Sequence, residues 1–296
     1  MIKMIYVVKH DNKFPFSRGI LARSISNSGV SPEEAYQLVE ETKKELEESG
    51  NDMILSRDIK EFVSRKLVER GYDKQNRYYL TRSAIKNSSK PLLILIGGGS
   101  GVGKSTVSAE VAHKLGITRV VNTDTIREIM RSIISEDLIP TLHQSSFEAW
   151  KSLKTPLVEN KQIYAFQQQV SLVSECVIAV IRRAIKEGLK MVINGVHIVP
   201  GFLKKSIINE YGDYILQYVI DVPDVEQHKQ NFYKREESSS RDPERYIDNI
   251  DNIRWTHDYI LNMAQRNNVK IVENVDFDKL VIMILDDIID KLNGRL

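Results

Sequence analysis

Residues 92–107 read LLILIGGGSGVGKSTV, an apolar run that breaks into glycines and ends with a lysine and two hydroxyl side chains. The five apolar residues Leu92–Ile96 predict a short strand that is buried on both faces. From Gly98 onward the spacing Gly98-x4-Gly103-Lys104-Ser105 is the phosphate-loop pattern, in which successive backbone N–H groups point at phosphate oxygens. Lys104 can reach the β- and γ-phosphates, and the Ser105 hydroxyl can bind Mg²⁺.

This stretch therefore predicts a nucleoside triphosphate site at the start of a helix, whose positive end adds to the attraction for phosphate. The residues that we expect to bind the nucleotide are Gly98, Gly99, Ser100, Gly101, Val102, Gly103, Lys104, Ser105 and Thr106.

The composition narrows the class of protein. The chain has 296 residues, 42% of them hydrophobic, which is enough for two domains. Lys and Arg number 42 against 40 Asp and Glu, so the net charge of +2 gives no bulk electrostatic case for nucleic-acid binding. A single cysteine, Cys176, excludes an internal disulfide and suits a reducing cytoplasm. With no signal-peptide pattern at the start and no long apolar run, we expect a cytoplasmic protein that does not span a membrane.

The chain changes its pattern near residue 90. Residues 1–88 predict a small, mostly helical domain, with a capping box at Ser31–Glu34 that opens a helix to about Glu48. The polar stretch SAIKNSSKP at 83–91 is the best candidate for a linker. Residues 89–296 then form the second predicted domain.

Strands and helices alternate in the second domain. The strand candidates share short apolar runs between helical stretches: Leu92–Ile96, Arg119–Val121, Lys190–Ile193, Ile215–Asp221 and Lys270–Val272. Five such units around a phosphate loop predict an α/β fold with a parallel five-stranded sheet and helices on both faces. Ligands then bind at the carboxyl ends of the strands.

The segment NTDTIREIMR follows the second predicted strand. Asp124 would face the phosphate loop, where its carboxylate can orient or deprotonate an acceptor hydroxyl, or hold Mg²⁺ through water together with Ser105. The alternative for Asp124 is a helix N-cap. Arg127 lies one turn further on and suits an anionic acceptor. We therefore count Lys104, Asp124 and Arg127 as candidate catalytic residues.

The segment NFYKREESSSRDPERY at 231–246 places three arginines around a serine run. Such a loop can close over the site and expel water, which prevents ATP hydrolysis. We assign Arg235 and Arg245 to the nucleotide, and we expect Arg241 to act in catalysis by reaching the γ-phosphoryl group on closure. The alternative is a solvated loop with ion pairs to Glu236, Glu237 and Glu244.

The first domain resembles a known family. Its sequence MIYVVKHDNKFPFSRGILARSISNSGVSPEEAYQLVEE, followed by LSRDIKEFVSRKLVERG and YYLTR, is similar to the ATP-cone domain over about residues 1–82. The resemblance implies a regulatory nucleotide, with Lys9, Arg18 and Arg23 as candidate phosphate contacts. At His10-Asp11-Asn12 the family more often has an Arg-Asp-Gly type of turn, so a packing domain without nucleotide is the alternative.

The second domain resembles the archaeal 2-phosphoglycerate kinases over residues 91–296. The resemblance depends on GGGSGVGKST, NTDTIREIMR, IPTLHQSSFEAWK (139–151) and VINGVHIVPGF (192–202). It implies transfer of the γ-phosphoryl group of ATP to 2-phosphoglycerate, which gives 2,3-bisphosphoglycerate, the precursor of cyclic 2,3-diphosphoglycerate.

An acceptor with a carboxylate and a phosphate needs several cations to offset desolvation. The candidates for substrate binding are Arg127, Arg131, His143 and His197. For the two histidines, ordinary hydrogen bonding near loops is an equal alternative. The strand KMVIN ends in Asn194, where an acidic residue that supports Mg²⁺ is common in phosphate-loop enzymes, so Asp124 and Asp221 are the remaining acidic candidates. Two alternatives stay open: a kinase for another small hydroxyl compound or a nucleotide, and a nucleotide-sensing regulator.

Overall fold

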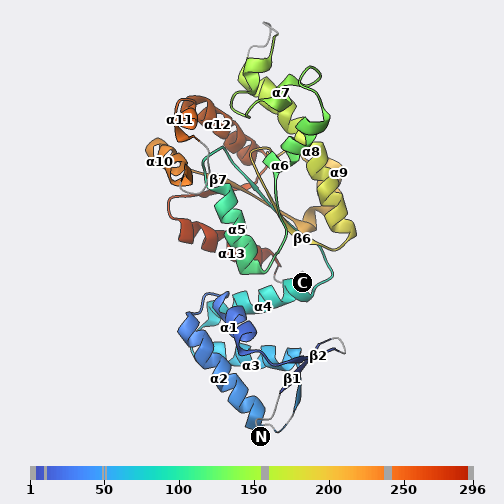
Figure 1. The fold of residues 1–296 in the computed structure, drawn as a ribbon, viewed down its shortest axis with the longest axis vertical. Helices are drawn as coiled ribbons and strands as arrows, with labels where there is room; N and C mark the ends of the chain where they lie inside the picture. The colour runs from blue at the N-terminus through green and yellow to red at the C-terminus, as the bar shows by residue number, and fades with distance from the viewer. Residues whose placement is uncertain are drawn as a thin grey trace. The chain divides into compact units, whose positions relative to one another are not determined.

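The computed structural model describes residues 5–9, 12–48, 50, 52–154, 160–236 and 242–292. The chain forms two compact units (Figure 1). The first consists mainly of the residues up to Asn87, and the second mainly of those from Ser88 onward. Each unit is described below by itself.

The first unit combines a small sheet with four helices. The strands β1 (Tyr6–Lys9), β2 (Asn12–Pro15) and β3 (Met53–Leu55) form a sheet in the order β2-β1-β3, in which β1 and β3 are parallel. The helices are α1 (Arg18–Ser26), α2 (Pro32–Glu48), α3 (Ser56–Glu69) and α4 (Asp73–Asn87). The unit has its own hydrophobic core, formed mainly by the apolar faces of α1, α2 and α3.

The capping box at the start of α2 forms as predicted. The Ser31 hydroxyl accepts a hydrogen bond from the Glu34 backbone N–H at 3.3 Å and donates one to the Glu34 carboxylate at 2.9 Å. The predicted linker, in contrast, is partly wrong. Helix α4 continues to Asn87, and only residues 88–91 lie between it and the next strand. Ile85 is buried, so its apolar side chain keeps the polar stretch helical for one more turn.

The second unit contains the predicted parallel sheet. Its strands are β4 (Leu92–Gly97), β5 (Val120–Asn122), β6 (Lys190–Asn194), β7 (Ile215–Asp221) and β8 (Lys270–Glu273). They pair in the order β5-β6-β4-β7-β8, and every pair is parallel. The phosphate-loop strand β4 is central and fully buried, which explains its unbroken apolar run.

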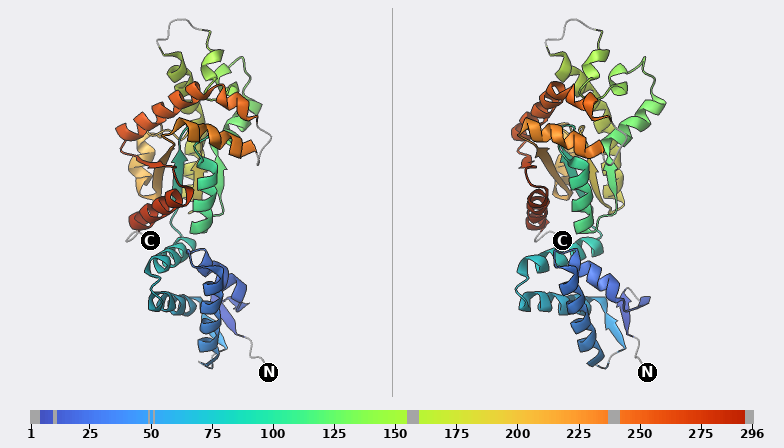
Figure 2. Two further views of the ribbon diagram at one scale, coloured as in Figure 1. Left: turned by 90° about the vertical axis from the view of Figure 1, so that its left-hand side faces the viewer. Right: turned by 60° about the vertical axis from the view of Figure 1, so that its left-hand side comes forward.

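Helices cover both faces of this sheet (Figure 2). The helical elements are α5 (Lys104–Leu115), α6 (Thr123–Ile133), α7 (Pro140–His143), η1 (Ala149–Ser152), α8 (Lys161–Lys186), α9 (Lys205–Tyr211), η2 (Gly212–Tyr214), α10 (Val225–Glu236), α11 (Pro243–Ile247), α12 (Ile250–Arg266) and α13 (Phe277–Leu292). Leu93 and Leu95 of β4 pack against α6 and α8 on one face. Helices α5 and α13 lie on the opposite face (Figure 1).

Helix α8 has the length and apolar composition of a membrane span, the one such helix within the described ranges. Its residues Phe166, Val170, Val177 and Ile181 are buried against the sheet and its neighbouring helices. The packing of a core helix therefore accounts for the apolar composition of α8.

Candidate active site

A cavity of about 1010 Å³ opens at the carboxyl ends of the strands. Its lining comes from the phosphate loop, the first turns of α6, the segment between α7 and η1, the turn after β6, helices α10 and α11, and the turn after β8. Because parallel strands all end on this edge, residues far apart in the sequence meet there.

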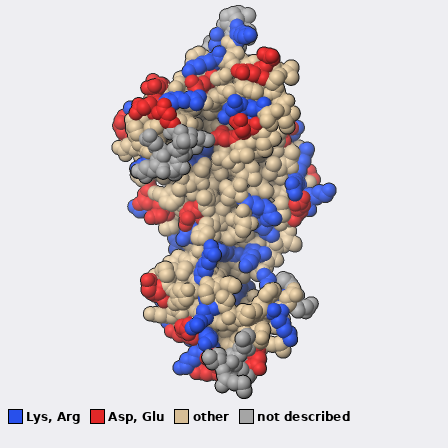
Figure 3. Space-filling view, viewed as in Figure 1, with Lys and Arg blue, Asp and Glu red and all other residues tan. Residues whose placement is uncertain are grey.

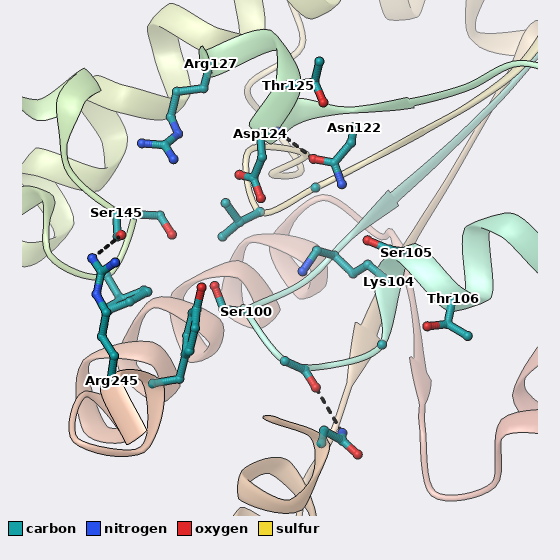
Figure 4. A pocket seen from close by; sticks show the side chains of 18 of the residues that line it. Ser100, Lys104, Ser105, Thr106, Asn122, Asp124, Thr125, Arg127, Ser145 and Arg245 are labelled. Atoms are coloured by element: carbon teal, nitrogen blue, oxygen red, sulfur yellow. Dashed lines mark hydrogen bonds between the residues drawn. The ribbon is translucent and has the colours of Figure 1, made fainter. Parts of the chain in front are cut away.

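The phosphate loop forms one side of the cavity (Figure 4). Ser100, Gly101 and the run 103–106 line it, whereas Gly98, Gly99 and Val102 do not. Lys104 is the first residue of α5, and its Nζ donates a hydrogen bond to the Gly99 carbonyl oxygen at 2.5 Å. The lysine thus lies over the loop, with the positive end of α5 behind it.

Asp124 faces the same space as Lys104 (Figure 4). The N-cap of α6 is Asn122, whose Oδ1 accepts a hydrogen bond from the Asp124 backbone N–H at 2.7 Å. The alternative that Asp124 serves as the helix cap is therefore wrong. Its carboxylate lies in the cavity, where it can meet a hydroxyl or a metal ion.

The other acidic candidate, Asp221, is engaged elsewhere. Its Oδ1 accepts a hydrogen bond from His257 Nε2 at 2.8 Å, and it does not line the cavity. Burial raises the pKa of Asp221, but the hydrogen bond from His257 and the nearby charge of Arg254 outweigh it and hold the pKa below its ordinary value. Asn194 is buried, and its Oδ1 accepts from Asn122 Nδ2 at 3.0 Å. Among these three residues, only Asp124 lines the cavity together with Ser105.

A preformed metal cluster is absent from the described part of the chain, which holds no group of three or more His, Cys, Asp or Glu side chains that could bind an ion. Ser105 and Asp124 both line the cavity. Two protein ligands fit Mg²⁺, which is commonly held by one or two protein groups together with substrate phosphates and water.

Basic side chains lie across the cavity from the phosphate loop (Figure 4). Arg127 Nη1 donates to the carbonyl oxygens of Leu142 at 3.2 Å and Gln144 at 2.6 Å, which ties α6 to the segment after α7. Arg131 Nη1 pairs with Glu128 at 2.8 Å. Both arginines line the cavity, as an anionic acceptor would require.

His143 also lines the cavity, and its Nε2 lies 2.8 Å from the Ile134 carbonyl oxygen. Because that carbonyl can only accept, Nε2 carries the hydrogen. In the neutral ring, Nδ1 is then unprotonated and can accept a hydrogen bond.

His197, in contrast, does not line the cavity, and its expected role as a direct substrate ligand is wrong. The ring is buried, with Nδ1 3.0 Å from Thr123 Oγ1 and Nε2 3.0 Å from Gln169 Oε1. Burial lowers the pKa of His197 to about 4, so the ring is neutral near pH 7. It supports the start of α6, where Asp124 lies, from behind.

Of the three arginines of the expected lid, only Arg245 can be placed. Its Nη2 donates to Ser145 Oγ at 2.9 Å and to Glu148 Oε2 at 2.6 Å, and the Glu148 bond raises the pKa of Arg245. Arg245 thereby lines the cavity next to Ser145 (Figure 4). The side chain of Arg235 and the whole of Arg241 are outside the described residues.

Sequence reasoning missed several lining residues. The cavity also includes Ser145, Ser146 and Phe147, three polar residues of α10 (Gln227, Asn231 and Lys234), and Asn274, Val275 and Phe277 after β8. The residues after β8 could have been found, because the rule that ligands lie at strand carboxyl ends applies to the fifth strand as well. The α10 residues carry no signal of their own.

Basic and acidic side chains are interspersed on the face drawn in Figure 3. At the cavity, two such opposite charges form ion pairs: Arg131 pairs with Glu128, and Arg245 pairs with Glu148.

Comparisons with known proteins match both parts of the chain. Residues 5–88 match the model of the ATP cone domain, and residues 93–252 match a model described as an AAA domain. A gluconokinase from Sinorhizobium meliloti has a similar chain path at a TM-score of 0.41 and 10% sequence identity, covering 69% of this chain and 97% of that one.

Curated relatives match nearly the whole chain. The 2-phosphoglycerate kinase of Pyrococcus furiosus is 40% identical over 97% of this chain and 94% of its own length. That of Thermococcus kodakarensis is 39% identical over 98% of both chains, and that of Methanothermobacter thermautotrophicus is 39% identical over 94% of this chain and 90% of its own. With a phosphate loop, a parallel five-stranded sheet and relatives at this identity over almost its full length, the chain belongs to the 2-phosphoglycerate kinase family.

Proposed function

We propose that this chain transfers the γ-phosphoryl group of ATP to the free hydroxyl group of 2-phosphoglycerate and so makes 2,3-bisphosphoglycerate. The observation that carries the proposal is a single cavity with a phosphate loop on one side and Asp124, Arg127 and Arg131 on the other. The names of the relatives supply the acceptor.

The phosphate-loop side supplies the ATP site. Backbone N–H groups of the loop and the first turn of α5 surround the phosphates, and Lys104 neutralises the charge that develops on the transferring group. The Ser105 hydroxyl and Asp124 would hold Mg²⁺ together with the nucleotide phosphates. When bound, the ion offsets the charge of the phosphates.

The opposite side supplies the acceptor site. Asp124 would accept the proton of the attacking hydroxyl, since the other carboxylate on the described cavity wall, Glu128, pairs with Arg131. Arg127, Arg131 and Arg245 offer guanidinium groups that match phosphate and carboxylate. An analogue without the second anionic group would make fewer of these contacts and so bind less tightly.

The test is an acceptor panel. Purified protein with Mg·ATP should phosphorylate 2-phosphoglycerate, with 3-phosphoglycerate and glycerate used at least tenfold less well in kcat/KM, as read by phosphorus NMR of the products. Asp124→Asn should lower kcat and leave the dissociation constant of ATP within a few-fold. Equal use of glycerate, or wild-type turnover by Asp124→Asn, would refute the acceptor assignment and the base assignment respectively.

We also propose that the first unit binds a regulatory nucleotide, as the ATP cone match supports. Of its candidate phosphate contacts, Lys9 Nζ donates to Asn87 Oδ1 at 3.0 Å and Arg18 pairs with Glu40 at 2.8 Å. Arg23 lies close enough to Arg82 for its charge to lower the pKa of Arg82, after the larger effect of burial. Two neighbouring guanidinium groups favour an anion between or beside them.

A further inference from the structure

Gly99 of the phosphate loop is a glycine that the motif does not require. Gly99 occupies a variable position of the pattern, and its backbone is not in the left-handed region. A Cβ atom at this position would lie 2.7 Å from the His257 Cβ and 3.0 Å from its Cγ. Glycine is needed at 99, then, because it lets His257 of α12 approach the back of the loop.

His257 makes a specific bond at this close approach. The Gly99 backbone N–H donates to His257 Nδ1 at 3.0 Å, and His257 Nε2 lies 2.8 Å from Asp221 Oδ1. An amide N–H can only donate, so Nδ1 is unprotonated and Nε2 carries the hydrogen that it donates to the Asp221 carboxylate. The ring is completely buried, and Asp221 is the last residue of β7.

We propose that His257 is a positioning residue for ATP binding, which holds the Gly99 peptide so that the rest of the phosphate loop presents its N–H groups to the phosphates. The inference rests on the proposed ATP site. Both backbone polar groups of Gly99 are held: His257 Nδ1 accepts from its N–H, and Lys104 Nζ donates to its carbonyl oxygen at 2.5 Å. Loss of the His257 contact would therefore disturb Gly99, whose carbonyl oxygen also accepts the hydrogen bond from Lys104.

The next residue of the loop is held in a similar way. His228 of α10 donates from Nε2 to the Ser100 carbonyl oxygen at 2.6 Å, and its ring lies 6.1 Å from that of His257. Burial lowers the pKa of His228 to about 4, so it remains neutral near pH 7. The nearby Arg254 is directed at the carbonyl oxygens of Val222 and Pro223. Two neutral histidines thus fix two successive residues of the loop from behind, as a preorganised site requires.

The competing explanation is that His257 only provides a partner for Asp221. Two substitutions separate the explanations, because the amide of asparagine can occupy the place of Nδ1, whereas that of glutamine reaches the place of Nε2. His257→Asn keeps an acceptor for Gly99 and loses the donor to Asp221. His257→Gln keeps the donor to Asp221 and leaves the Gly99 N–H without an acceptor.

The readout is the dissociation constant of Mg·ATP, measured by calorimetry without acceptor, together with steady-state kinetics. In His257→Gln the buried Gly99 N–H has no acceptor, which destabilises the conformation of the phosphate loop. The dissociation constant of Mg·ATP should therefore rise by about tenfold or more. His257→Asn should stay within a few-fold of wild type, and the KM for 2-phosphoglycerate should be unchanged in both. Because the binding measurement needs no acceptor, it remains valid even if the acceptor assignment fails.

Tyr218→Phe is the matched control. It removes the 2.7 Å hydrogen bond that Tyr218 donates to Asp287, and Tyr218 is on the same strand as Asp221. It should lower the urea midpoint without changing ATP affinity. If glutamine preserves ATP affinity better than asparagine, or if both variants and the control weaken it equally, the positioning role is overturned.

A measurement on the wild-type protein covers the case in which the variants do not fold. In ¹⁵N-histidine spectra at pH 7, His257 should show an unprotonated Nδ1 and a protonated Nε2. Protonation of Nδ1 under these conditions would contradict the bond to Gly99 and overturn the proposal.

Discussion

Acid should destabilise the second unit through His197. Burial lowers the pKa of this ring to about 4, from an ordinary value of 6.5; the charge of Asp124 raises it, and those of Arg127 and Lys104 lower it further. In the unfolded chain the ring binds a proton as the pH falls through 6.5, whereas in the folded chain it stays neutral down to about 4. The unfolded state therefore binds more protons in this window, and the stability falls as the pH is lowered from 6.5 to 4.

The difference between the folded and unfolded pKa values of His197 sets the size of this loss in stability. At 1.36 kcal/mol for each pH unit, it corresponds to about 3 kcal/mol of unfolding free energy for His197. A domain of this kind is stable by only about 5–15 kcal/mol, so the loss is large enough to measure.

The comparison needs a variant that cannot titrate. His197→Gln keeps a donor for Gln169 but has no ionisable ring, so its unfolding free energy should lack this part of the pH dependence. Urea unfolding followed by tryptophan fluorescence is the assay, since Trp150 and Trp255 both belong to the second unit. The difference in unfolding free energy between wild type and variant should change by about 3 kcal/mol between pH 7.5 and pH 4. Parallel curves across this range would refute the buried neutral ring.

Three further predictions concern the site and the first unit. Lys104→Met should lower kcat by about a hundredfold or more in the kinetic assay, since the charge on the transferring group loses its cation. Gly195→Ala should destabilise the second unit by about 2–4 kcal/mol in urea, because its φ is +152° and a Cβ would lie 1.7 Å from Thr123 Oγ1. A fragment of residues 1–88 should bind a nucleotide in calorimetry, and a chain that begins at Lys90 should show altered ATP dependence; failure of both would make the first unit structural.

The fold could be predicted from the sequence because its signals are local. The run Leu92–Ile96 is buried on both faces, and the glycine spacing that follows it fixes the phosphate loop without help from distant residues. The capping box at Ser31 forms between residues only three positions apart. The prediction of the linker was partly wrong, because the buried side chain of Ile85 keeps a polar segment in helix α4.

The roles of the histidines could not be predicted, because they depend on partners far along the chain. His197 meets a threonine 74 positions away, and His257 meets Gly99 at a separation of 158. A histidine next to a strand end has the same local sequence whether it faces the cavity or the core. Only the packing of α6, α8 and α12 around the sheet decides which of the two occurs.

The acceptor side of the cavity has a consequence for specificity. Arg131 and Arg245 are not bare cations, since they pair with Glu128 at 2.8 Å and with Glu148 at 2.6 Å. An acceptor must therefore compete with a carboxylate for each guanidinium group that it uses. A ligand with both a phosphate and a carboxylate can replace two such partners at once, whereas a ligand with one anionic group leaves at least one pair intact. The three arginines, set against two paired glutamates, thus suit a doubly anionic acceptor, which is the chemistry of 2-phosphoglycerate.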